Sequence, residues 1–113
     1  MKKVLVVDDD ALIVEIILDV LSELDVTVLC AYDGEQALQL VQDQAPDLVI
    51  SDLVLPRLDG WQLCQRLRAS PKTRDVRFVA MSAIHRPKSV DCNAFLPKPF
   101  DIDDLLATVE RLV

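Results

Sequence analysis

Residues 47–60, DLVISDLVLPRLDG, constrain the fold more than any other stretch. The apolar run 48–50 has no polar alternation, which predicts a strand buried on both faces. The strand leads into Asp52, and Pro56 and Gly60 then turn the chain and begin a helix. A carboxylate at the carboxyl end of a central parallel strand lies where open α/β sheets bind their ligands. The alternative for Asp52 is an ordinary turn residue, since aspartate is common at strand ends.

Strand and helix signals alternate along the 113 residues, which are enough for one domain, residues 1–113, with a real core. The predicted strands are 4–7, 26–31, 48–52, 78–81 and 95–96, and the predicted helices are 12–24, 35–44, 61–68 and 102–113. Asp10 and Asp101 are expected to cap the first and last helices. The alternation predicts a parallel sheet with helices on both faces. Right-handed crossovers then favour the doubly wound, flavodoxin-like order 2-1-3-4-5.

Composition excludes several classes of protein. A formal net charge of −7 argues against a nucleic-acid-binding surface, which needs a basic patch. The apolar run 4–7 is too short for a signal peptide and ends in three acids, and no stretch is long enough to cross a bilayer. We therefore expect a cytoplasmic chain that binds no membrane. Three widely spaced cysteines, Cys30, Cys64 and Cys92, indicate reduced, mostly packing thiols.

Polar side chains follow four of the predicted strands. Asp8 and Asp9 follow the first, Asp52 ends the third, Ser82 ends the fourth and Lys98 follows the fifth. In the predicted strand order these side chains converge on one cleft, where three carboxylates would repel one another. Mg²⁺ removes that penalty and suits such oxygen ligands. A lysine and a hydroxyl beside the metal suit a phosphoryl group.

Other phosphate chemistries fit these residues less well. Gly34 and Gly60 are the only glycines, so the chain has no glycine-rich phosphate loop. Acids after the first strand would repel a flavin phosphate. A phosphatase of the haloacid-dehalogenase type needs a second aspartate two residues after Asp52, where this chain has Val54. A metal hydrolase lacks ligands, because His85 is the only histidine.

The motifs VLVVDDD, SDLVLPRLDG, AMSA and FLPKPF, in that order, resemble a response-regulator receiver domain of two-component signalling. The resemblance covers essentially the whole chain. It implies that Asp52 accepts a phosphoryl group from a phosphohistidine on a histidine kinase or phosphotransfer protein. It also implies an Mg²⁺ site, in which Asp9 binds the ion directly, Asp8 mainly through water, Asp52 by its carboxylate and Val54 by its backbone carbonyl.

The resemblance assigns roles to three further residues. Lys98 would pair with the phosphoryl oxygens, and its peptide bond to Pro99 would be cis, an isomer readily available only before proline. Ser82 would move to hydrogen-bond the phosphoryl group while Phe95 turns inward behind it. Such a chain catalyses at most its own phosphorylation and dephosphorylation and is not a turnover enzyme on a small substrate.

The chain departs from the family pattern in three respects. Phe95 stands where many relatives have tyrosine. Val54 and Ile84 stand where polar side chains in relatives can position water, so we expect slow self-dephosphorylation. Only the twelve residues 83–94, with Pro87 among them, connect the fourth strand to the fifth, so the helix between them (the fourth in relatives) should be shortened to a turn or two or be missing.

The first predicted helix, 12–24, has an unusually wide apolar face. Its polar residues form one narrow stripe and leave an apolar arc of about 200°, against the roughly 100° that core packing needs. Either part of this face binds a partner or the helix is wedged deeply in the fold. The resemblance favours docking of a histidine kinase or phosphotransfer protein there. The chain ends soon after its last helix, so we expect no output domain and signalling to an unknown downstream protein. The alternative is a pseudo-receiver, an interaction module that works without phosphorylation.

Overall fold

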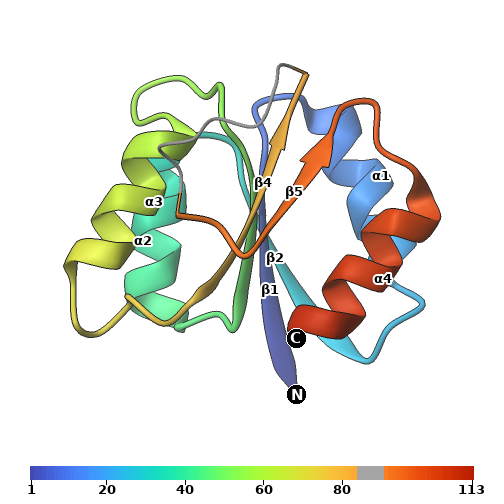
Figure 1. Ribbon diagram of the computed structural model, residues 1–113, viewed down its shortest axis with the longest axis horizontal. Coiled ribbons are helices and arrows are strands. Elements are labelled where there is room, and N and C mark those ends of the chain that lie inside the picture. The colour runs from blue at the N-terminus through green and yellow to red at the C-terminus, as the bar shows by residue number, and fades with distance from the viewer. Residues whose placement is uncertain (84–90) are drawn as a thin grey trace.

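The computed structural model describes residues 1–83 and 91–113 (Figure 1). Strands and helices alternate as the sequence predicts. The strands are β1 (Lys2–Val7), β2 (Val26–Ala31), β3 (Leu48–Asp52), β4 (Arg77–Ser82) and β5 (Ala94–Pro97). The helices are α1 (Ala11–Leu21), α2 (Gly34–Gln44), α3 (Gly60–Ala69) and α4 (Ile102–Leu112).

The five strands form one sheet in the order β2-β1-β3-β4-β5, and every neighbouring pair is parallel. This confirms the predicted flavodoxin-like topology. In the register, Asp52 of β3 lies opposite Met81, and Ser82 of β4 lies opposite Pro97. The carboxyl ends of β1, β3, β4 and β5 therefore meet at one edge of the sheet.

Helices cover both faces of the sheet, α2 and α3 on one side and α1 and α4 on the other (Figure 1). Successive strand residues alternate between two cores: Leu5 and Val7 face α2 and α3, whereas Val4 and Val6 face α1 and α4. All five residues of β3 are buried, which confirms the prediction of a strand covered on both faces. Burial of this kind supplies most of the drive to fold.

Each helix begins directly after an aspartate whose side chain accepts a hydrogen bond from a backbone N–H two or three residues later. These residues are Asp10, Asp33, Asp59 and Asp101. The predicted caps Asp10 and Asp101 are confirmed. α2 and α3 each begin one residue earlier than predicted, at the glycine that follows the cap. α1 ends at Leu21, before the predicted residue 24, because Ser22 hydrogen-bonds back to the carbonyl of Asp19.

The wide apolar face of α1 is divided between core and solvent. Four residues are buried against the sheet and α4, namely Val14, Ile17, Val20 and Leu21. Leu12 and Ile16 are exposed, at 62% and 39%. The helix is therefore not wedged deeply in the fold, and part of its apolar face remains open.

The predicted shortening of the helix between residues 83 and 94 concerns mainly residues 84–90, which lie outside the described residues. Ile84, His85 and Pro87 belong to that stretch, so the label α4 refers here to the last helix. Of the helices described, each is too short or too polar to cross a bilayer.

Candidate functional site

Three carboxylates meet at the carboxyl edge of the sheet. Asp8 and Asp9 directly follow β1, and Asp52 is the last residue of β3. One carboxylate oxygen from each lies within 4.8 Å of the others. Asp8 is completely buried and Asp52 nearly so, whereas Asp9 is exposed. The parallel pairing of β1 with β3 brings these predicted residues together from positions more than 40 apart in the chain.

Lys98 reaches into this carboxylate cluster from the residue after β5. Its ammonium lies 2.6 Å from Asp8 Oδ2 and 2.8 Å from Asp52 Oδ2. Its backbone N–H donates to the carbonyl of Ser82 over 2.8 Å, which extends the β4–β5 pairing by one residue. The Lys98–Pro99 peptide bond is cis, as the sequence resemblance implies. The side chain is only 18% exposed, so this contact is well shielded from water.

Burial and charge act in opposite directions on these groups. Burial raises the pKa of Asp8, and the nearby Asp52 adds to this, while hydrogen bonds from Lys98 and the Asp10 N–H lower it only in part. Burial would lower the pKa of Lys98, but its hydrogen bonds and attraction to Asp52 and Asp8 outweigh this and raise it. The lysine therefore stays protonated and compensates the charge of the carboxylates.

The loop after β3 holds Asp52 in a tight turn. The Val54 N–H donates to Asp52 Oδ1 over 3.1 Å, and the Leu53 N–H donates to the Met81 carbonyl over 3.0 Å. The Gly60 N–H closes the loop on the Leu53 carbonyl. A Cβ at Gly60 would collide with the backbone carbonyl of Asp52, so a glycine is needed here. The side chain of Val54 is 62% exposed.

The other predicted site residues lie on the two strands beyond β3. Ser82 is buried at the end of β4, and its carbonyl accepts the Lys98 N–H. Phe95 of β5 is partly buried and packs against the core on the α2–α3 face of the sheet. The sequence analysis assigned Lys98 only to phosphoryl oxygens and did not anticipate that it bridges Asp8 and Asp52. Its strand-end position beside both carboxylates is the signal that could have indicated this contact.

The family model of the response regulator receiver domain matches residues 4–110. The chain belongs to this family. Receiver domains of response regulators operate in two-component signalling, so the predicted family and class of function are confirmed.

Curated relatives of this receiver include transcriptional regulators. The DNA-binding dual master transcriptional regulator RpaA of Synechocystis is 34% identical over 100% of this chain and 49% of its own length. The response regulator MprA of Mycobacterium ulcerans is 35% identical over 98% of this chain and 50% of its own. The chain thus spans about half the length of the curated relatives it matches.

Solved receiver structures share the whole fold. Chemotaxis protein CheY4 of Vibrio cholerae is 28% identical, with a TM-score of 0.90 over 100% of this chain and 99% of its own. The receiver domain of a sensor histidine kinase from Pseudomonas aeruginosa PAO1 is 27% identical, with a TM-score of 0.90 over 98% of this chain and 96% of its own. The latter is described with a magnesium ion coordinated in its active-site cleft.

Proposed function

We propose that Asp52 accepts a phosphoryl group from a phosphohistidine of a histidine kinase or histidine phosphotransfer protein. The observation that carries this proposal is the Lys98 ammonium, 2.8 Å from an Asp52 carboxylate that ends the central strand. Asp52 offers an oxygen nucleophile at the sheet edge, and Lys98 stands beside it to receive an anionic oxygen. In relatives this arrangement accompanies two-component signalling, which is the class of function shown by the family.

The reaction is an in-line transfer. An Asp52 carboxylate oxygen forms a bond to phosphorus while the bond from phosphorus to the imidazole nitrogen breaks, and that nitrogen keeps the electron pair. The Lys98 ammonium neutralises charge on the transferred oxygens and does not need to be recruited, since the folded chain already holds it in the cleft. The product is a mixed anhydride that water can later hydrolyse.

Three carboxylates within 4.8 Å of one another form a donor set that fits a divalent cation with oxygen preference. Asp8, Asp9 and Asp52 would hold Mg²⁺, together with the backbone carbonyl of Val54. When bound, Mg²⁺ would supply positive charge to the phosphoryl oxygens that Lys98 does not reach. The metal would also relieve the repulsion among the acids that Lys98 alone offsets for two of them.

Ser82 and Phe95 would convert phosphorylation into a conformational change. Ser82 ends β4 next to the Lys98 backbone, so a new hydrogen bond from its hydroxyl to the phosphoryl group would pull on the β4–β5 edge. Phe95 projects from β5 and is only partly buried, which leaves its ring room to turn inward. An unknown downstream protein would read this change.

The exposed part of α1 is the surface we propose for the phosphoryl donor. Leu12 and Ile16 are apolar, exposed and on the helix that starts directly after the acidic residues Asp8 and Asp9. A donor helix packed on them would lie within reach of the Asp52 cleft. Exposed apolar residues beside a reactive site are typical of partner-binding surfaces.

The test is intact-protein mass after incubation with acetyl phosphate or phosphoramidate and Mg²⁺. The wild-type chain should gain one phosphoryl group, and the Asp52→Asn variant and a metal-free sample should gain none. Asp59→Asn, which changes an exposed capping residue of the same loop, is the matched control and should still be labelled. Absence of an adduct with every donor would favour the pseudo-receiver, a module that binds its partner without phosphorylation.

We expect the Asp52 phosphoryl group to be lost slowly. Val54 lies two residues beyond Asp52 with an exposed apolar side chain, which cannot orient an attacking water molecule. Val54→Asn should shorten the phosphoryl half-life about tenfold, below the 10²–10⁴ that a full general base supplies. Mass spectra at intervals after donor removal measure this. A wild-type half-life of seconds, or no change in the variant, would contradict it.

A further inference from the structure

The edge strand β5 has little support of its own. It has four residues, Ala94–Pro97, and pairs only with β4. Pro97 has no N–H to contribute to the ladder. A short strand paired on one side frays easily, so contacts beyond the ladder must hold its two ends. At the exit, Lys98 provides such a contact through Asp8 and Asp52.

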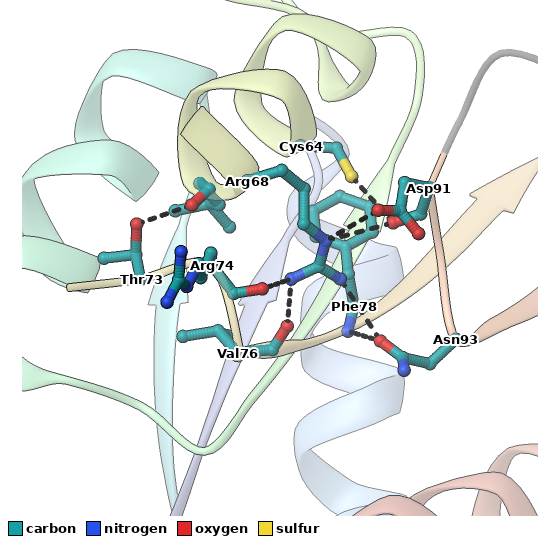
Figure 2. Close-up of polar contacts among 9 residues, drawn as sticks. Cys64, Arg68, Thr73, Arg74, Val76, Phe78, Asp91 and Asn93 are labelled. Atoms are coloured by element: carbon teal, nitrogen blue, oxygen red, sulfur yellow. Dashed lines mark hydrogen bonds and ion pairs between the residues drawn. The ribbon is translucent and has the colours of Figure 1, made fainter. Parts of the chain in front are cut away.

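At the entry of β5, Arg68 provides a second contact (Figure 2). Its guanidinium donates to the carbonyls of Arg74 at 2.8 Å and Val76 at 2.5 Å, to the Asp91 carbonyl at 3.3 Å and to Asn93 Oδ1 at 3.2 Å. The Arg68 side chain is only 19% exposed, unlike those of most basic residues in this chain. One side chain of α3 thus joins the connection to β4 with the two residues that lead into β5.

Asn93 completes this junction. Its Oδ1 also accepts from the Phe78 N–H at 2.8 Å, and its own backbone N–H donates to the Phe78 carbonyl at 2.7 Å. The thiol of Cys64, one turn before Arg68 on α3, donates to the Asp91 carbonyl at 3.2 Å. Residues 91–93 are therefore attached to both α3 and the start of β4.

We propose that Arg68 is a positioning residue for the phosphoacceptor site. By fixing the entry of β5 it sets the strand in the register that delivers Lys98 to Asp8 and Asp52. This inference rests on the proposed function of Asp52. Its physical basis is the shape of guanidinium, whose five donors in a rigid plane satisfy several carbonyl oxygens at once, which a lysine cannot do. Without it, those oxygens lose partners and the entry of β5 is released.

The test compares Arg68→Met and Arg68→Lys with Arg66→Met, a matched change of an exposed arginine on the same helix. Hydrogen exchange is followed at the amides of β5 and Lys98 and, for reference, at those of β1 and β3. We expect exchange in β5 and at Lys98 to be about tenfold faster in Arg68→Met, intermediate in Arg68→Lys and unchanged in Arg66→Met. The amides of β1 and β3 should change little.

The second readout is the initial rate of phosphorylation by phosphoramidate with Mg²⁺, which should fall severalfold in Arg68→Met and recover partly in Arg68→Lys. Unchanged β5 exchange, equal acceleration in all strands, or faster β5 exchange with a normal phosphorylation rate would each overturn the proposal. Asn93→Ser, which keeps the contacts of Arg68 to Arg74 and Val76, provides the same test if Arg68→Met does not fold. If wild type takes no phosphoryl group, the proposed function fails, and the exchange data still decide whether Arg68 holds β5.

Discussion

Replacement of Lys98 by methionine is expected to reduce both phosphorylation and stability. The rate with phosphoramidate and Mg²⁺ should fall about 10²–10³-fold, the usual effect of removing one preorganised donor from a developing oxyanion. The free energy of unfolding without metal should fall by about 3 kcal/mol. The cause is that Asp8 and Asp52, both nearly inaccessible to water, would lose the cation that lies 2.6 and 2.8 Å from them.

Intact mass against time gives the rate for Lys98→Met, and urea unfolding gives the stability. Lys2→Met is the matched control, because Lys2 is 60% exposed and its ion pair with Asp47 is weak, at 3.8 Å. Mg²⁺ should restore part of the lost stability, since it replaces the missing positive charge. A variant as stable as wild type would mean that Lys98 does not compensate the buried acids.

Replacement of Asp8 by asparagine is expected to have the opposite effect on stability. Burial raises the pKa of Asp8 above its ordinary value of 3.8, which means that the folded chain disfavours the ionised carboxylate. Lys98 keeps Asp52 as a partner in the variant. Without metal at neutral pH, Asp8→Asn should therefore raise the free energy of unfolding by about 1–2 kcal/mol.

The pH dependence of this difference follows from the same shift. Since the folded pKa of Asp8 lies above the unfolded one, the destabilisation of wild type is absent below pH 3.8 and grows as pH rises through the folded pKa. The gap between Asp8→Asn and wild type should close in acid. Urea unfolding at several pH values, in EDTA, measures it. A constant gap at all pH values would contradict this account.

Magnesium should reverse the order of the two proteins. A ligand that binds only the folded chain stabilises it by about 2.7 kcal/mol at a concentration 100 times its Kd. Wild type offers three carboxylates and Asp8→Asn only two, so wild type should gain more. The variant that is more stable in EDTA should become the less stable one in saturating Mg²⁺. Such a reversal would identify Asp8 as a residue retained for metal binding at the expense of stability.

The sequence by itself determined the order of elements, the parallel sheet and the residues at the strand ends. Each follows from short-range information: the uninterrupted apolar run before Asp52, aspartates before helices, and alternation that leaves few topologies. Once the strand order is known, Asp8, Asp9 and Asp52 must lie at the same edge of the sheet. That is why the predicted carboxylates meet within 4.8 Å.

Only the tertiary structure decided which charged side chains touch. Lys98 bridges carboxylates 46 and 90 positions away, and no local pattern reports such a contact. Arg68 is one of several basic residues between positions 66 and 77, and only packing reveals that it faces carbonyl groups instead of water. The wide face of α1 was likewise ambiguous, because its exposure depends on how much of it the sheet and α4 cover. Contacts between distant segments arise when the whole chain packs, and hydrophobic periodicity carries no record of them.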